Sequence, residues 1–345
     1  MNRAKKIFKD ILLFALASFG PKMISFFLIP LYTSYLSTTD YGTMELLNTI
    51  YSLLLPILTL DISDAIMIYT IECKNTERED LPMYIGKRIV GVSSVILIGI
   101  LAILVIFWRL KNIKIYCLYI FAQYFSNAVY NNYLAFFKGR NKVNCIVIGS
   151  IISSVVTIIS NIAFVFVFKW GLYGLLFATV LASSFSVTYF FLVRKTDNKK
   201  IGTIEDSREF KKKMLCYSIP LIFTGIAWWI NSSSDRLFIS VLANVSLNGI
   251  YAVANKIPAI ITACHNVIFQ ALQLSVFNEI KSNDADVYLK KLYHIYSMVM
   301  VTVCSILILM DKTIATLLFK KDFFIAWHYA PALLISTVFF QYQVI

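Results

Sequence analysis

Ten long apolar stretches dominate this sequence and restrict what it can fold into. Each is about 20 residues long, the length at which a helix crosses roughly 30 Å of hydrocarbon. A bilayer offers no water to an unpaired backbone amide, so such stretches form helices with internal hydrogen bonds. The predicted spans are 11–35, 44–70, 89–108, 115–137, 145–168, 172–193, 214–242, 248–273, 290–310 and 326–345. The sequence therefore predicts an all-α polytopic membrane protein with about ten transmembrane helices.

The composition excludes several other classes of protein. Of the 345 residues, 59% are hydrophobic and 15% are charged, with a mean hydropathy of +0.72. A soluble domain of this length needs more polar surface. The six cysteines are scattered without CxxC or His/Cys metal spacing, and there are only three histidines. We therefore predict no metal site, no catalytic triad and no cofactor.

Positive charge alternates between the loops and predicts the orientation of the chain. With the N-terminus in the cytoplasm, 22 of the 32 Lys and Arg residues lie in cytoplasmic segments, seven lie in external loops and three lie within spans. This bias favours a cytoplasmic N-terminus. The basic N-terminal segment leads into an apolar run too long for a signal peptide, so we expect a retained first helix. The net charge of +13 is interpreted as topology and attraction to lipid headgroups, without nucleic acid as a partner.

The longest polar stretch, 194–213, divides the chain into two predicted lobes. Residues 1–193 form an N-terminal lobe of six helices, 194–213 form a basic cytoplasmic linker, and 214–345 form a C-terminal lobe of about four. Because the chain enters the membrane from the cytoplasm on both sides of the linker, a parallel repeat is expected. The second lobe would then be incomplete, since it ends in its fourth helix.

A short motif recurs at corresponding positions of the two lobes and supports the repeat. The links after the first and seventh helices both contain S-x-L followed by G-x5-N-x-I. The matching residues are Gly42, Asn48 and Ile50 in the first lobe and Gly249, Asn255 and Ile257 in the second. The fold class is therefore two pseudo-repeated helical bundles.

Charged residues inside the predicted spans are the candidate functional residues, because a charge at mid-bilayer costs about 2.5–3.5 kcal/mol. Lys22 follows Gly20-Pro21 in the first helix. Asp61 and Asp64, three residues apart, are predicted to share a face of the second helix at a depth similar to that of Lys22. Two readings stay open and can coexist. One is a Lys22–Asp61 ion pair that joins two helices, and the other is a cavity cation with a titratable acid as its gate.

The second lobe carries further intramembrane charges. Asp235 and Arg236 close the seventh helix, where the arginine either faces a cavity or snorkels to the external interface. Lys256 lies about a third of the way into the eighth helix, and we favour a cavity-facing role for it. Uncharged polar residues recur at helical spacing along the fourth, fifth and eighth predicted helices. Such stripes usually mean hydrogen bonds between helices, but several stripes together with three buried cations favour a hydrated translocation path. The amides assigned to this cavity are Asn48, Asn127, Asn131, Asn161, Asn231 and Asn255.

Two stretches resemble a known family. The first is FALASFGPKMISFFLIPLYTSYLSTTDYGTMELLNTI from Phe14, followed by LPILTLDISDAI from Leu55. The second is INSSSDRLFISVLANVSLNGIYAVANKIPAII from Ile230. They are similar to flippases of O-antigen and other repeat-unit polysaccharides, in the MOP superfamily that includes MATE multidrug exporters. The resemblance covers the whole chain.

This resemblance implies a fold, a substrate and a cellular setting. The fold is two helical bundles that face each other across a cavity and work by alternating access. The substrate is an undecaprenyl-diphosphate-linked oligosaccharide, moved from the cytoplasmic to the external leaflet of the bacterial inner membrane. Lys22, Arg236 and Lys256 would attract the diphosphate or acidic sugars. A polysaccharide polymerase and a chain-length regulator are the implied protein partners.

The energy source of such a cycle is not readable from the sequence. Asp61, Asp64 and Asp235 are the candidates for coupling to H⁺ or Na⁺, or for gating.

Two other functions remain as alternatives. A MATE-type exporter of small cationic drugs would use the same architecture, although three buried cations argue against it. A membrane-embedded polymerase or glycosyltransferase usually places catalytic acids on long external loops. Here those loops are short, and their acids (Asp40, Asp311 and Asp322) form no cluster. We therefore predict a transporter rather than an enzyme.

Overall fold

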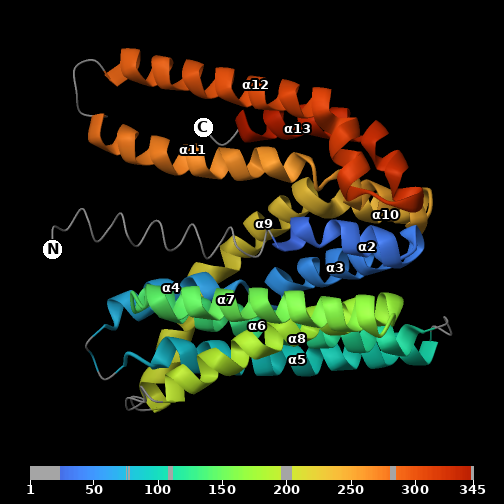
Figure 1. Cartoon of the computed structure of the whole chain (residues 1–345). Coiled ribbons are helices and arrows are strands. Elements are labelled where there is room, and N and C mark those ends of the chain that lie inside the picture. Colours follow the sequence, from blue (N-terminus) through green and yellow to red (C-terminus); the bar gives the residue numbers. More distant parts are fainter. Residues whose placement is uncertain are drawn as a thin grey trace. The chain divides into compact units, whose positions relative to one another are not determined.

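The computed structural model describes residues 24–74, 76, 78–107, 112–195, 204–279 and 285–342, and within them every regular element is a helix (Figure 1). The predicted all-α class is confirmed. Five of the described helices are long and apolar enough to cross a membrane, or seven if each of two bent pairs counts as one span. The chain is thus a multi-pass membrane protein, while the total of ten spans stays a prediction.

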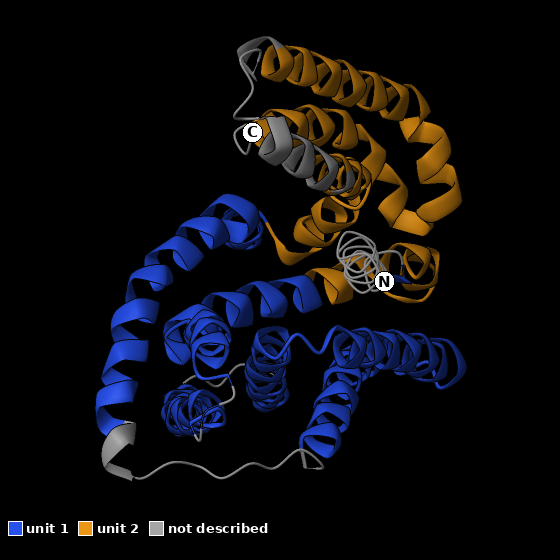
Figure 2. Cartoon of the chain, turned by 90° about the vertical axis from the view of Figure 1, so that its left-hand side faces the viewer, with its two compact units in different colours: residues 1–24, 43–243 blue, residues 25–42, 244–345 orange. Residues whose placement is uncertain are grey.

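The chain forms two compact units (Figure 2). Among the described residues, unit 1 contains Thr43–Ala243, and unit 2 contains Ser25–Gly42 together with the chain from Asn244 onward. The division by contact differs from the predicted lobes, because residues 214–243 group with unit 1 and residues 25–42 group with unit 2. The predicted lobes were defined by the internal repeat, whereas the two units are defined by contacts between residues. The lobe boundaries therefore stay a prediction.

Unit 1 consists of long helices packed side by side. They are α3 (Thr38–Thr59, from residue 43), α4 (Ile62–Glu72), α5 (Leu81–Phe107), α6 (Ile113–Gly139), α7 (Val143–Asn161) with the π-helical turn Ile162–Val167, α8 (Gly171–Lys195) and α9 (Ile204–Leu242). Phe190 of α8 is fully buried against Tyr133 and Phe137 of α6. A Cβ atom on Gly149 of α7 would lie 2.5 Å from the Phe190 ring, so the glycine makes room for it.

The outer surface of unit 1 is apolar, as hydrocarbon requires. On α5, Val92 is 57% exposed and Val95 is 69% exposed. In water a surface of this kind would mark an interaction site. On a spanning helix it is the face that contacts lipid acyl chains.

The predicted second span, 44–70, is broken rather than continuous. Pro56 has no amide hydrogen to continue the helical ladder. Leu60 and Asp61 then adopt positive φ angles of 55° and 48°, and α3 and α4 meet at a bend of 47°. Left-handed backbone costs a non-glycine residue about 1–2 kcal/mol, so packing must hold this break in place.

Unit 2 is also helical, and its bent pair is Lys321–His328 with Ala330–Tyr342. It comprises α2 (Ile29–Tyr35), the first residues of α3, α10 (Val245–Ala254), α11 (Pro258–Glu279), α12 (Ala285–Leu318), the 3₁₀ helix η2 (Lys321–His328) and α13 (Ala330–Tyr342). The predicted eighth span, 248–273, is interrupted by a turn at residues 255–257 between α10 and α11. Pro258 opens α11, where its missing amide hydrogen costs nothing.

Within unit 2, the start of α3 crosses α10 at two glycines. A Cβ atom on Gly42 would overlap the carbonyl oxygen of Val245, and one on Gly249 would overlap that of Thr38. Beside them the side-chain amide of Asn248 donates to the Gly42 carbonyl at 3.1 Å. Gly42 and Gly249 are corresponding residues of the internal repeat, and so are Thr38 and Val245 at the same spacing. The two copies of the repeated motif therefore contact each other directly.

We expect Gly42→Ala and Gly249→Ala each to destabilise the protein by about 1–3 kcal/mol, because a methyl group would push the two backbones apart. Thermal unfolding in detergent measures the effect. Gly99→Ala in α5 is the control, because a Cβ atom there meets nothing within 4 Å. It should be neutral or stabilising by up to about 1 kcal/mol. Equal unfolding temperatures for the three variants would contradict the close crossing.

Candidate functional site

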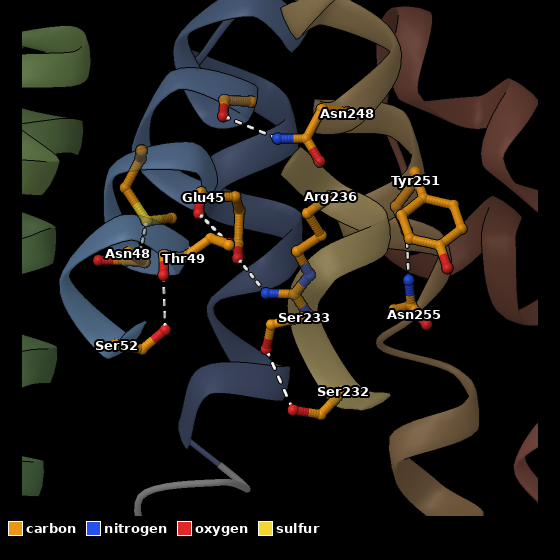
Figure 3. A network of polar contacts seen from close by, with 12 residues as sticks. Glu45, Asn48, Thr49, Ser52, Ser232, Ser233, Arg236, Asn248, Tyr251 and Asn255 are labelled. Carbon is orange, nitrogen blue, oxygen red and sulfur yellow. Dashed lines mark hydrogen bonds and ion pairs between the residues drawn. The ribbon is translucent and has the colours of Figure 1, made fainter. Parts of the chain in front are cut away.

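An ion pair inside the membrane-spanning part of unit 1 joins α3 to α9 (Figure 3). The guanidinium Nη1 of Arg236 lies 2.7 Å from Oε2 of Glu45. The Glu45 side chain is 6% exposed and the Arg236 side chain is 23% exposed. Arg236 does not end α9, because the helix continues to Leu242, and Glu45 is its counter-charge. The position of the pair relative to the external interface stays a prediction. A carboxylate partner compensates the charge of an arginine where hydration is poor.

The same two helices make further polar contacts along their length. The indole nitrogen of Trp229 on α9 donates to the Thr49 carbonyl at 3.0 Å and to the Ser52 hydroxyl at 3.2 Å. One turn before Trp229 on α9, Gly225 packs on Pro56 of α3. The order of these contacts shows that α3 and α9 run antiparallel. We call Glu45, Thr49, Ser52, Trp229 and Arg236 the α3–α9 seam.

A second set of contacts ties α3 to the interior of unit 1. The hydroxyl of Tyr119 on α6 donates to Oδ1 of Asn48 at 2.7 Å and lies 3.3 Å from the Thr179 hydroxyl of α8. The amide of Asn48 lies 2.6 Å from the Met44 sulfur. One polar chain thus crosses three helices, which fixes the rotation of α3 and with it the direction of Glu45.

The break between α3 and α4 places Asp61 at a small polar cavity. The cavity has a volume of about 60 Å³ and is lined by Thr59, Asp61 and Ser63 at the break and by Asn131 and Asn132 on α6, among others. Asp61 makes no side-chain hydrogen bond or ion pair with the residues that the structure describes. The buried amide nitrogen of Asn132 has no partner among the described residues either. The cavity could hold a water molecule or a small cation.

The structure corrects the predicted relation between Asp61 and Asp64. Asp61 lies in the left-handed break, and α4 starts only at Ile62, so the two acids do not share a helical face. Asp64 is exposed in the first turn of α4, whereas Asp61 is partly buried. Their proposed roles in coupling or gating stay predictions.

Lys256 lies in the turn between α10 and α11 of unit 2. Its backbone amide donates to the Val253 carbonyl at 3.0 Å, and its side chain is partly buried. The turn ends the helical ladder about a third of the way into the predicted span, so Lys256 lies at a helix break rather than within a continuous helix. Lys22 lies outside the described residues. Its pairing with Asp61 therefore stays a prediction.

The predicted cavity amides fall into three groups. Asn127, Asn161 and Asn255 each donate to a carbonyl one turn earlier on their own helix, at 2.8, 2.7 and 3.1 Å. Asn48 reaches other helices, and Asn131 lines the Asp61 cavity. Asn231 is exposed on α9. A shared path through all of these amides stays a prediction.

The predicted acid Asp235 lies next to the paired arginine. Its carboxylate accepts a hydrogen bond from the Arg236 backbone amide at 2.8 Å.

Sequence reasoning missed Glu45 and a charged network at the end of unit 1 where α5 starts and α6 and α8 finish. There Arg140 contacts Glu79 and Asp80 at 3.1 Å each, and Arg194 lies 3.7 Å from Asp80. Both guanidinium groups lie over the Phe136 ring. The run ERED at 77–80 was a signal for this network, and a lone acid at the start of a span was the signal for Glu45.

These residues can bind charged groups. In the described part of the chain, no three His, Cys, Asp or Glu residues gather as a metal site would require. What the spanning helices do offer is a paired arginine, a lysine at a helix break and an acid at a cavity. Such groups in membrane helices mark substrate and ion pathways.

We expect Glu45→Leu to destabilise the protein by about 3 kcal/mol, because Arg236 would keep its charge without its carboxylate. The double variant Glu45→Leu/Arg236→Leu should recover much of this loss. A double-mutant cycle of thermal unfolding measures both effects. The exposed Asp64→Asn is the control and should change the unfolding free energy by less than about 0.5 kcal/mol. Additive effects of the two leucine substitutions would show that the pair contributes nothing.

We also expect Leu60→Gly to be less destabilising than Leu58→Gly by about 1–2 kcal/mol. Both leucines are partly buried and line the same groove, but only Leu60 has a positive φ angle. Glycine relieves left-handed strain at position 60 and weakens the helix at position 58. Chemical denaturation of the two variants compares them directly. A larger loss at position 60 would argue against the strained break.

Comparisons with known proteins identify the fold. Residues 7–273 match the family model described as polysaccharide biosynthesis protein. An inward-facing multidrug resistance MATE transporter of the MOP superfamily is similar with a TM-score of 0.68 and 14% identity, over 93% of this chain and 81% of that chain. An outward-facing multidrug resistance MATE family transporter of the MOP superfamily is similar with a TM-score of 0.59 and 17% identity, over 96% of this chain and 80% of that chain. No curated protein sequence matches.

The structural likeness at these identities shows the fold, and the family match covers more than half of the chain. Together they confirm the resemblance predicted from the two sequence stretches. The chain belongs to the polysaccharide biosynthesis protein family and has the fold of transporters in the MOP superfamily.

Proposed function

We propose that this protein is a flippase that moves an undecaprenyl-diphosphate-linked oligosaccharide from the cytoplasmic to the external leaflet. The observation that carries the proposal is Arg236, a cation held within a spanning helix by Glu45, in a member of a polysaccharide biosynthesis family. A charged headgroup cannot cross hydrocarbon without a charge-compensating route. The setting is the bacterial inner membrane, with the N-terminus in the cytoplasm.

The ion pair suggests how a charged substrate is received. A guanidinium binds phosphate through charge-assisted hydrogen bonds that match its planar fork. Glu45 compensates the charge of the arginine in the absence of substrate, and a diphosphate oxygen then takes the place of Glu45. Lys256 and Lys22 are the further candidate contacts. The polyprenyl tail stays in lipid during the cycle of alternating access.

Asp61 remains the candidate coupling residue in this cycle. Its support is the cavity at the α3–α4 break, where the carboxylate has room for a proton or a sodium ion. Asp64, exposed in the first turn of α4, and Asp235, next to the paired arginine, are weaker candidates.

In a deletion strain that carries the full-length gene, we expect Arg236→Ala and Lys256→Ala to lower surface polysaccharide and to accumulate lipid-linked repeat units. Loss of one charge-assisted phosphate contact, about 1.5–3 kcal/mol, corresponds to a roughly 10- to 100-fold slower step. Arg236→Lys should retain part of the activity. Lys114→Ala, an exposed lysine at the start of α6, is the control. Normal polymer in both alanine variants at equal expression would remove the proposed roles.

Export of small cationic drugs is the second candidate, favoured by the similarity to multidrug MATE transporters. A drug-susceptibility panel separates the two. A flippase mutant leaves drug resistance unchanged and loses surface polymer, whereas a drug exporter does the reverse. Polymerase and chain-length regulator remain the proposed partners of the flippase.

A further inference from the structure

An apolar groove lies on unit 1 between α3, α5 and α9, outside the α3–α9 seam. Its volume is about 340 Å³. Its walls are mostly large aliphatic side chains, among them Ile57, Leu58, Ile89, Val92, Ile96 and Leu215. Several of these are exposed at the surface of the unit. The groove can therefore hold a hydrocarbon chain that comes from the surrounding membrane.

Two cations from different helices line one part of this groove. Arg88 belongs to α5 and Lys211 belongs to α9. Each lies seven residues after the first residue of its helix, which is about 10 Å along the axis. Neither makes an ion pair or hydrogen bond with any residue that the structure describes. The groove thus offers two positive charges at the end where α5 and α9 start, and apolar walls beyond them.

We propose that this groove is the docking site of the carrier lipid, with the diphosphate across Arg88 and Lys211 and the first part of the polyprenyl chain along the aliphatic walls. The inference rests on the proposed function and names a loading site separate from Arg236. Basic pockets between membrane helices bind anionic headgroups. Two cations on two helices complement the two phosphates, and each buried methylene of the chain adds about 0.8 kcal/mol.

A neighbouring groove supplies a matched control. Lys87 precedes Arg88 on α5 but lines a different cavity, with its ammonium over the rings of Tyr133 and Phe191 at 5.3 and 5.7 Å. Removal of the charge at position 87 changes the net charge of the chain as removal at position 88 does. It leaves the proposed docking groove intact.

The first test measures binding of undecaprenyl diphosphate to the full chain in phosphatidylcholine nanodiscs, by native mass spectrometry with titration. We expect Arg88→Gln and Lys211→Gln each to weaken binding by about tenfold or more, as loss of a charge-assisted contact does. Lys87→Gln should bind like the unsubstituted protein. Unchanged binding in both groove variants, or an equal loss in Lys87→Gln, overturns the proposal.

The second test fills the groove without altering charge. Val92→Trp places a large ring in the groove, whereas Val95→Trp places it on an exposed part of the same helix outside the groove. Only the first should weaken binding, by about tenfold. Both positions are exposed, so both variants should fold, and size-exclusion chromatography verifies this. Equal binding by the two tryptophan variants overturns the proposal.

A competition experiment distinguishes the carrier lipid from ordinary anionic lipid. Phosphatidylglycerol added at equal concentration should displace little undecaprenyl diphosphate, and equal competition would overturn the assignment. The failure of the inference and that of the proposed function are separable. Loss of transport in Arg236→Ala with unchanged binding in Arg88→Gln and Lys211→Gln removes only the docking site. Binding that depends on the groove in a protein that moves no oligosaccharide removes only the flippase function.

Discussion

Charge held in a low-dielectric, lipid-surrounded environment is the constraint on which this structure depends. A helix satisfies its own backbone in hydrocarbon, but an arginine side chain on it needs a counter-charge. Glu45 provides that charge for Arg236 at 2.7 Å. The position of Glu45 depends in turn on the rotation of α3, which the Asn48–Tyr119–Thr179 chain of hydrogen bonds fixes. Ion pairing therefore links a candidate substrate cation to the packing of unit 1.

Helix breaks are the second way in which this protein places polar groups in apolar surroundings. Pro56 precedes the break at Leu60 and Asp61, and Pro258 follows the turn that contains Lys256. In a continuous helix, an acid or a lysine at these positions would be closely surrounded by neighbouring side chains. A break opens room beside the charged group, as the cavity at Asp61 shows. Transporters use interrupted helices for the same reason.

Much of the fold followed from hydrophobic length alone. The predicted spans 115–137 and 172–193 lie within α6 and α8, and the described part of span 89–108 lies within α5, because a run of about 20 apolar residues has few alternatives to a spanning helix. The breaks were not predicted, since a left-handed residue such as Leu60 has no sequence signature. The shared face of Asp61 and Asp64 was inferred from helical spacing, which does not apply across a break. Glu45 was missed because its partner lies 191 residues away in the chain.

The sequence by itself determined that this chain is a helical membrane protein, that its two parts repeat a motif around Gly42 and Gly249, and which family it resembles. These are properties of local pattern, and the bilayer enforces them through length and apolarity. Only the tertiary structure decided which of the polar residues meet. It paired Arg236 with Glu45, gave Asp61 a cavity and brought the two repeat glycines into contact, because pairings between distant segments depend on how helices rotate and cross.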